Sequence, residues 1–460
     1  MDKLPAALVI KILLKNKNNT AGLRKVCLNF AALRIKIKQN YVHYRCGVFL
    51  LKQTSCEHLF DAVTHLTFSD DFNQTVDNLP ATLIQLTLGN NFNQTVDALP
   101  TTLKQLTLVG KFNQTVNALP ANLERLILGW NSVIHLTFND DFNQTVDNLP
   151  ATLTHLALGN SFNLAVDNLP ATLKQLTIEG KFNQTVNALP ANLERLTLRG
   201  GFNQTVDALP ATLKQLTLGH NFNQTIDALP ATLKHLTLGR NFNQTVDALP
   251  ATLERLTLGY DFNQTVNALP AILEQLTFGD KFNQSVDNLP AALTHLKLGY
   301  NFNQKVDALP TTLTYLKLGN NFNQTVDALP TTLKQLRLGN SFNQTIDALP
   351  ATLTHLTLGW DFNQTVNALP ATLKLLTLGW DFNQTVDNLP ATLKRLRLGG
   401  KFNQTVDALP ATLEQLTLGS KFNQTISNIP KSLKLLKLHR YSTATITCTH
   451  SAEIKHYDYE

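Results

Sequence analysis

The chain has 460 residues, of which 43 % are hydrophobic and 16 % are charged, a balance that permits a large buried core and excludes a chain kept disordered by its own charge. The net charge of +6 is unevenly distributed, because residues 1–58 hold 11 basic and two acidic side chains (+9), which leaves 28 basic and 31 acidic side chains (−3) in residues 59–460. The basic segment is compatible with an acidic partner, an anionic membrane or nucleic acid, although a solvated basic helix face is the commoner explanation, and we expect no specific nucleic-acid binding.

The sequence carries no sign of export. A signal peptide is not expected, because Asp2 lies where a basic region should precede the apolar run and Lys11 interrupts that run. No apolar run approaches the ~18 residues that a transmembrane helix needs. Four cysteines show neither paired metal-ligand spacing nor a disulfide framework, which favours a reducing compartment; they are Cys27, Cys46, Cys56 and Cys448. We therefore expect a soluble, cytoplasmic protein without a membrane span.

Residues 1–58 form a first segment that differs from the rest of the chain. In residues 4–33, apolar side chains recur at helical spacing on either side of the polar stretch KNKNNTAG, which predicts two or three short α-helices. Residues 34–58 suit a helix or a strand, and we assign them only as a joint. One interpretation of the segment is a helical cap, since the first coil of a repeat array would otherwise expose an apolar end.

The order of apolar residues in this segment supports a second interpretation. A Leu-Pro step opens the first helix, an Ile-Leu pair follows two turns later, and a Val-Cys pair precedes an aromatic residue by three positions. This order resembles an F-box, a short helical motif that docks a protein onto the Skp1 adaptor of a ubiquitin ligase. The resemblance implies six adaptor-binding residues: Leu4, Pro5, Leu8, Ile12, Val26 and Phe30. Ala6 and Ala7 stand where the F-box usually has acids, and Phe30 where it has Trp, so the cap and the F-box both remain open.

After this segment the chain is built of 20-residue repeats. The stretch FNQTVDNLPATLIQLTLGNN at 72–91 returns with the same apolar positions, and its phenylalanine recurs from Phe72 to Phe422 with one break, which makes 18 copies. A period of 20 is typical of leucine-rich-type solenoids, in which one unit adds one coil and cannot bury its apolar face alone. We predict a solenoid over residues 59–438. Residues 439–460 are predicted to form a C-terminal cap, with one strand in YSTATITC, and a short polar tail.

The repeat is broken once, where two phenylalanines are 30 instead of 20 residues apart. Residues 133–202 repeat residues 63–132 closely, which indicates a tandem duplication. The first copy begins with half a repeat unit, and the second copy retained this half unit at the point where the two copies meet. We expect a short, irregular coil near residues 127–141.

One unit, residues 99–118, shows how a coil is built. Its L-x-x-L-x-L pattern has the period of a short strand with one buried face, and such strands would stack in parallel, one per coil. The Leu-Pro step marks the turn side of the coil, because Pro lacks the N–H that a strand ladder needs, and the Gly after the strand fits a sharp turn. Six side chains are expected to point inward: Leu99, Leu103, Leu106, Leu108, Phe112 and Val116.

The polar columns of the repeat have structural and functional interpretations. Asn-Gln-Thr, as at Asn93, is formally a glycosylation sequon, but without a secretory signal we favour a ladder of stacked Asn side chains that hydrogen-bond the turn backbone from coil to coil. The column of Asp residues, as at Asp207, suggests a calcium site. Asn takes the same place at Asn187, however, and a calcium site is not expected to lose its carboxylate charge in this way. A turn-capping role is therefore favoured.

The outward strand positions differ from coil to coil and are the candidate binding surface. With strands ~4.8 Å apart, these side chains should form columns on the inner face of an arc. A basic and aromatic rim suits a protein partner, although a tolerated solvent face would show the same variation. The candidate partner-binding residues are Lys297, Lys317, Arg337, Trp360, Trp380 and Arg397.

Catalytic and cofactor signatures are absent from the sequence. It contains no G-x-S-x-G elbow, P-loop or H-E-x-x-H motif. His135 and His155 are neighbours across coils but lack a third ligand, so we expect no metal. The sequence therefore predicts a non-enzymatic protein without a cofactor.

The unit FNQTVDALPATLKQLTLG is similar to the FNIP repeat, a leucine-rich-like unit of amoebae and giant DNA viruses, over residues 63–438. Phe-Asn, Leu-Pro and L-x-x-L-x-L before Gly carry the resemblance, while Gln and Thr replace the Ile-Pro of the family name. Members often have an N-terminal F-box. The resemblance implies a protein–protein interaction scaffold, located in the host cytoplasm if the protein is viral. It further implies a substrate receptor of an SCF-type ubiquitin ligase, whose two partners are a Skp1-type adaptor and a substrate. The alternative is a structural or decoy repeat protein whose N-terminus only caps the coils.

Overall fold

The structure is a computed structural model. It describes residues 33–38 and 41–46 (backbone only), residues 64–108 except 69, 71, 74 and 78, parts of residues 112–160, all of residues 161–447, and residues 452–458.

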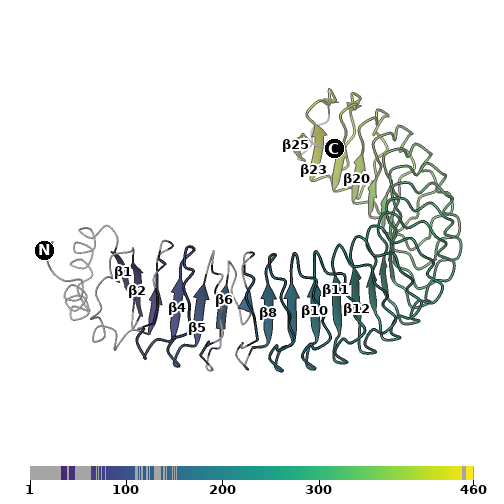
Figure 1. The fold of residues 1–460 in the computed structure, drawn as a ribbon. Helices are drawn as coiled ribbons and strands as arrows, with labels where there is room; N and C mark the ends of the chain where they lie inside the picture. Colours follow the sequence, from purple (N-terminus) through teal and green to yellow (C-terminus); the bar gives the residue numbers. More distant parts are fainter. Residues whose placement is uncertain are drawn as a thin grey trace. The chain divides into compact units, whose positions relative to one another are not determined.

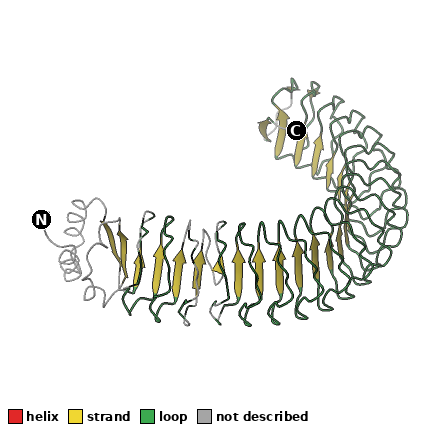
Figure 2. Ribbon diagram, in the orientation of Figure 1, coloured by secondary structure: helices red, strands yellow, loops and turns green. Residues whose placement is uncertain are grey.

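The chain forms two compact units, residues 1–221 and residues 222–460. In each unit, successive coils contribute short strands that are joined by turns and loops (Figure 1). The described residues contain no helix (Figure 2). The predicted leucine-rich-like solenoid, with one strand per 20-residue coil, is confirmed for the repeats.

The strands of the first unit are β1 (Leu33–Lys38), β2 (Tyr41–Cys46), β3 (His65–Thr67), β4 (Gln85–Leu88), β5 (Gln105–Leu108), β6 (Arg125–Leu128), β7 (Leu136–Thr137), β8 (His155–Leu158), β9 (Gln175–Ile178), β10 (Arg195–Leu198) and β11 (Gln215–Leu218). The strands of the second unit are β12 (His235–Leu238), β13 (Arg255–Thr257), β14 (Gln275–Thr277), β15 (His295–Lys297), β16 (Tyr315–Lys317), β17 (Gln335–Arg337), β18 (His355–Thr357), β19 (Leu375–Thr377), β20 (Arg395–Leu398), β21 (Gln415–Leu418), β22 (Thr425–Ile426), β23 (Leu435–His439), β24 (Thr445–Ile446) and β25 (Glu453–Tyr457).

Neighbouring strands of the repeats pair in parallel, with equivalent positions side by side. Leu316 of β16, for example, pairs with Leu336 of β17. The first unit has one sheet from β3 to β6 and pairs β7 to β11 in order. Because the register is kept, residues 20 positions apart lie in one column, and the alternation along each strand assigns each column to the core or to the surface.

The core consists of columns of equivalent apolar side chains. The predicted inward side chains that the structure describes are all buried: Leu99, Leu103, Leu106, Leu108 and Phe112. Val116 lies outside the described residues, and its equivalent Val96 is 1 % exposed. The phenylalanines form a stack, in which the ring centroids of Phe302 and Phe322 are 6.2 Å apart and their planes differ by 7°. Each ring is therefore buried between equivalent rings, a geometry that adds to the hydrophobic contribution.

The Asn column satisfies polar groups of the turns. The Asn303 Oδ1 accepts the backbone N–H of Asn323 at 2.9 Å and the side-chain amide of Gln324 at 3.3 Å. The same N–H bond recurs from coil to coil, for example between Asn93 and Asn73 at 2.8 Å. The predicted Asn ladder is confirmed.

A second polar ladder was not anticipated from the sequence. The Thr312 hydroxyl lies 2.6 Å from the carbonyl oxygen of Ala291 and 2.8 Å from that of Leu293, both in the preceding coil. The turn itself is closed by the Leu313 N–H, which donates to the Pro310 carbonyl at 3.1 Å. The Leu-Pro step therefore leads into a turn, as predicted. The Thr two positions after the Pro hydrogen-bonds this turn to the preceding coil.

The Gly that follows most strands allows a close approach between coils. A Cβ at Gly319 would overlap the carbonyl oxygen of Gly299, its equivalent in the preceding coil. Among the described glycines, only Gly180 and Gly200 have a positive φ, 66° and 65°. Glycine thus follows the strand as predicted. In most coils, however, glycine is required at this position by the close packing of adjacent coils and not by a left-handed turn.

Part of the N-terminal segment forms strands. β1 and β2 pair antiparallel, with Leu33 opposite Cys46. The alternation in LRIKIK has the two-residue period of a strand, and β-branched Ile favours that conformation. For these two stretches, almost all of which the sequence left open between a helix and a strand, the structure has strands, and the described residues give no support to the predicted α-helical N-terminal segment. The helices predicted before them, and the proposed adaptor contacts, lie outside the described residues.

At the repeat break, β6 ends one sheet and β7 pairs with β8 in the next. Residues 129–135 lie outside the described residues. The irregular coil near residues 127–141 stays a prediction.

The C-terminal end contains more regular structure than predicted. β24, inside YSTATITC, pairs with β22. β25 pairs in parallel with β23, so the predicted polar tail contains a further strand. The Arg440 guanidinium donates to Asp458 at 3.0 Å, and the Tyr457 hydroxyl donates to the Leu418 carbonyl at 3.2 Å. The strand is hard to see in the sequence because most of its side chains are exposed.

Candidate functional site

The candidate site lies on the strand face of the second unit, the surface formed by the side chains that flank the buried central Leu of each strand. Lys297 pairs with Lys317, and Lys317 with Arg337, on three successive strands. The next two strands carry Thr357 and Thr377 at this position, and the strand after them carries Arg397. The parallel register thus places these six residues in one column, which we call the cation column.

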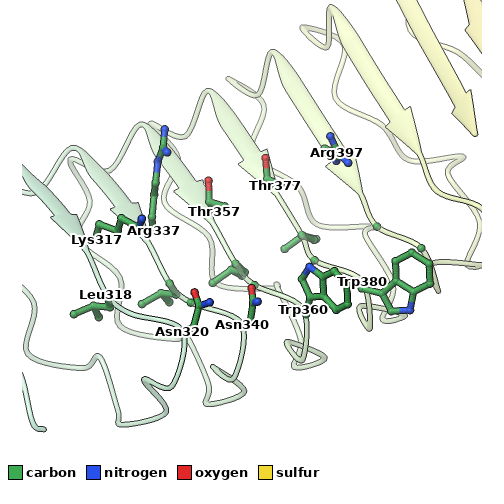
Figure 3. Close-up of a pocket in the computed structure, with 18 residues that line it drawn as sticks. Lys317, Leu318, Asn320, Arg337, Asn340, Thr357, Trp360, Thr377, Trp380 and Arg397 are labelled. Atoms are coloured by element: carbon green, nitrogen blue, oxygen red, sulfur yellow. The ribbon is translucent and has the colours of Figure 1, made fainter. Parts of the chain in front are cut away.

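A groove of about 550 Å³ runs between the cation column and the turns that follow the strands. Figure 3 shows two rows of side chains along it, one from the strands and one from the turns. The strand row consists of Lys317, Arg337, Thr357, Thr377 and Arg397, and the turn row of Asn320, Asn340, Trp360 and Trp380.

Glycines and small side chains create the groove. Gly359, Gly379 and Gly399 line it at the strand ends. A Cβ at each of these positions would overlap the backbone of the preceding coil, so the coils lie close together here. Four leucines complete the floor: Leu318, Leu338, Leu358 and Leu378. The two threonines in the cation column are short, which leaves space between the flanking cations.

The two tryptophans form a stacked pair on the surface. Their ring centroids are 5.9 Å apart and their planes differ by 26°. Trp360 is 59 % exposed, the second highest value among the large apolar or aromatic residues on the described surface. Gly400, which has no side chain, occupies the next position beyond Trp380 in the same column and lines the groove. A large exposed aromatic surface beside cations is characteristic of interaction sites.

The cations of the groove are not neutralised within the described part of the chain. There, Lys317, Arg337 and Arg397 make no ion pair, whereas other lysines of the same unit do. Lys281 lies 2.7 Å from Asp261, and Lys394 lies 3.1 Å from Glu414. The groove cations therefore keep their hydrogen-bonding and charge capacity for a ligand.

Acidic residues lie beyond the tryptophans. Asp361 and Asp381 each follow a Trp in the sequence. Asp381 is 2.9 Å from Lys401, and Asp361 is exposed. The strand side of the groove is therefore positive. Past the aromatic pair, Lys401 offsets the charge of Asp381, and Asp361 is an exposed carboxylate that makes no ion pair within the described residues.

Five of the six candidate residues predicted from the sequence line the groove. Lys297 does not, because it lies one strand further along the column, where its ammonium is 5.9 Å from the centre of the Tyr315 ring. The sequence analysis missed the two threonines, the two asparagines and the glycine floor. Their positions in the repeat could have revealed them, because the threonines and asparagines occupy the same repeat positions as predicted residues, and the glycines follow the strands.

The described residues offer no metal site or membrane-spanning element. Among them, no three His, Cys, Asp or Glu side chains are grouped to hold a metal ion. His295 lies in a strand column, but its Nδ1 is 2.9 Å from the Thr294 hydroxyl and its ring stacks on Tyr315. Within the same part of the chain, no helix is long and apolar enough to span a membrane.

The outward strand columns and parallel coils define a leucine-rich-like repeat protein. YopM from Yersinia enterocolitica shares the fold, with 21 % identity over 86 % of this chain and 91 % of that chain and a TM-score of 0.58. So does a chain of the Toll–Spatzle complex from Drosophila, with 15 % identity over 90 % of this chain and 65 % of that chain and a TM-score of 0.52. Such scaffolds generally bind proteins.

A more specific likeness links the chain to one repeat family. It is 37 % identical to CroV588, a circular leucine-rich-repeat protein of a giant virus, over 87 % of this chain and 76 % of that chain, with a TM-score of 0.61. The FNIP repeat model matches residues 112–161, 202–241, 222–261, 282–321, 305–341, 322–361, 342–379 and 402–441. The chain belongs to the FNIP repeat family. A search of curated protein sequences gave no match.

Proposed function

We propose that the protein is a non-enzymatic scaffold that binds a protein partner through the strand face of its second unit. The observation that carries this proposal is the groove, where three cations without acidic partners in the described part of the chain face a stacked Trp pair, of which Trp360 is exposed and Trp380 half-buried. Aromatic and Arg side chains supply most of the binding energy in protein interfaces. The rigid coil interior holds these side chains in fixed columns, so little order has to be gained on binding.

Charge reversal on the strand face tests this proposal. We would compare the intact chain with the triple variant Lys297→Glu, Lys317→Glu and Arg337→Glu. A matched control, with the same change in net charge, reverses three exposed lysines of the second unit outside the cation column: Lys305→Glu, Lys421→Glu and Lys431→Glu. Proteins captured by the intact chain from the cells that express it should be retained by the control and lost by the strand-face variant. The same capture by all three proteins would contradict the proposal.

A finer form of the proposal makes the protein a substrate receptor of an SCF-type ubiquitin ligase. Its support is the F-box-like order of Leu4, Ile12, Val26 and Phe30 in the sequence. In this form a Skp1-type adaptor binds the N-terminal segment and the strand face holds the substrate. The competing form is a structural or decoy repeat protein whose N-terminal segment only covers the first coil.

Adaptor binding separates these two forms. A purified Skp1-type adaptor should bind the intact chain and lose affinity for Ile12→Asp, because a buried carboxylate would lack a partner in an apolar contact. Lys17→Asp, in the predicted polar turn, is the control for charge. No binding to the intact, folded chain would exclude the ligase-receptor form and leave the capped scaffold.

A further inference from the structure

We propose that the groove binds an extended acidic segment of the partner protein, with two carboxylates four residues apart and apolar side chains at the first and third positions between them. This inference rests on the proposed function and specifies the partner of the same site. The spacing of the two arginines, the position of the tryptophans and the distribution of charge each contribute to it.

The arginine spacing sets the distance between the carboxylates. Arg337 is on β17 and Arg397 is on β20, three strands further along. Adjacent strands are ~4.8 Å apart, so the two side chains start ~14 Å apart. An extended peptide advances ~3.4 Å per residue, and four residues therefore cover about the same distance. Each guanidinium is able to bind one carboxylate in a bidentate manner.

The tryptophans belong to the two coils between the arginines. Trp360 follows β18 and Trp380 follows β19, the strands whose cation-column residues are Thr357 and Thr377. A ligand that spans the arginines consequently passes over short side chains, with the aromatic pair at the side of its midpoint (Figure 3). The first and third residues between the two carboxylates point to the opposite side of an extended peptide, and therefore toward the turn row when the carboxylates face the strand row. Apolar side chains at these two positions are placed to contact the two indole rings.

The charge pattern favours a peptide over a nucleic acid. Stacked Trp rings and cations also suit single-stranded nucleic acid. A base stacked on Trp360, however, would bring its phosphates close to Asp361, the exposed carboxylate that follows this ring in the sequence. Like charges placed side by side weaken binding. A peptide carries its negative charges only at the two positions that meet the arginines.

Direct binding to defined peptides tests this inference. The probe is a fluorescein-labelled nonapeptide with the core Glu-Phe-Ala-Phe-Glu, and its binding to the intact chain is followed by fluorescence anisotropy. We expect about tenfold weaker binding when both Glu are replaced by Gln, and a similar loss when the two Glu are made adjacent, because a charge-assisted hydrogen bond contributes on the scale of a tenfold change in affinity.

Variants of the protein locate the site. Arg337→Gln and Trp380→Ala should each weaken binding of the probe about tenfold, and both residues are on the surface, so the fold is retained. Arg395→Gln is the matched control, because Arg395 is on the same strand as Arg397 but does not line the groove. Its affinity for the probe should equal that of the unmodified chain.

Three results would overturn the inference. The first is equal binding of the spaced and adjacent Glu peptides, which would leave charge alone as the cause. The second is tighter binding of a nine-nucleotide single strand than of the peptide, which would make the groove a nucleic-acid site. The third is no binding of the probe while the strand-face charge reversal still removes the protein partner, in which case the proposed function stands and the groove assignment fails.

Discussion

The strand faces of the two units differ, although their interiors are alike. Leu176 in the first unit and Leu316 in the second are both fully buried. At the position of the cation column, the described strands of the first unit carry Thr, Ala or Ile, whereas the second unit has Lys or Arg on six strands, including Lys437 and Lys455 near the C-terminus. The comparison shows that the interior columns determine the coil and that the outward columns are free to determine what the coil binds.

The largest effect is expected when a ring is removed from the Phe column. Phe162→Ala and Phe322→Ala each delete a fully buried ring that stacks on both neighbours, and each should lower the local free energy of unfolding by about 3–5 kcal/mol. Hydrogen exchange measured coil by coil reports this loss, since long repeat arrays do not unfold in one step. The exposed Trp360→Ala is the control, with a change within about 0.5 kcal/mol. A large loss in only one unit would show that the interiors are not equivalent.

A smaller loss is expected when a methyl group is added between coils. Gly319→Ala in the second unit places a Cβ on the backbone oxygen of Gly299, so the coils have to separate, at a cost of about 1–3 kcal/mol. Gly201→Ala in the first unit is the matched substitution. Its Cβ would lie 3.2 Å from the nearest atom, the Lys181 carbonyl oxygen, and a small shift relieves the contact. Equal losses of thermal stability in the two variants would refute the explanation by close approach.

The Asn ladder should contribute less per residue. Asn283→Ala removes the oxygen that accepts the Asn303 N–H at 2.9 Å and the Gln304 amide at 3.2 Å, and the expected loss is about 1 kcal/mol because the site is only partly buried. Asn283→Asp keeps an acceptor oxygen and should recover most of the stability. Chemical denaturation of both variants measures the difference. An Asp variant as unstable as the Ala variant would show that the ladder depends on more than this acceptor.

The interior of the fold was predictable because it repeats. A 20-residue period with Leu and Phe in fixed places determines the strand, its buried face and the parallel stack, and the structure agrees for Leu103, Leu106 and Phe112. The Asn ladder was predictable because turn backbone groups need partners. The Thr ladder was not, because a hydroxyl such as that of Thr312 suits a turn or a solvent face equally in the sequence.

The groove was only partly predictable, for a physical reason. Sequence reasoning selects cations and aromatic residues because they stand out, and it found Arg337, Trp360 and Arg397. A groove, however, is formed by what is small or absent, and the two threonines and the glycine floor have no chemical signature of their own. Strand β25 was missed for a related reason. Most of its side chains are exposed, so it lacks the alternation of buried and exposed residues by which a strand is recognised in a sequence.

The smallest expected effect concerns ion pairs in the column before the strands, where one glutamate of each unit is compared. Glu414 in the second unit accepts from Lys434 at 2.9 Å and Lys394 at 3.1 Å, and these hydrogen bonds hold the pKa of its carboxyl below the ordinary value of 4.5. Glu194 in the first unit, whose pKa is also lowered, has one such lysine, Lys214 at 3.0 Å.

A carboxyl whose pKa is lowered by folding stabilises the fold above its unfolded pKa and loses that contribution as the pH falls through the folded pKa. Glu414→Gln should therefore lower Tm slightly at pH 7, and the difference from the unmodified chain should vanish as the pH falls well below 4.5. Glu194→Gln should show a smaller difference with the same sign. Both differences should shrink at high salt, because the pairs are exposed to solvent. A Tm difference that persists at pH 2 would mean that Glu414 acts through packing instead of charge.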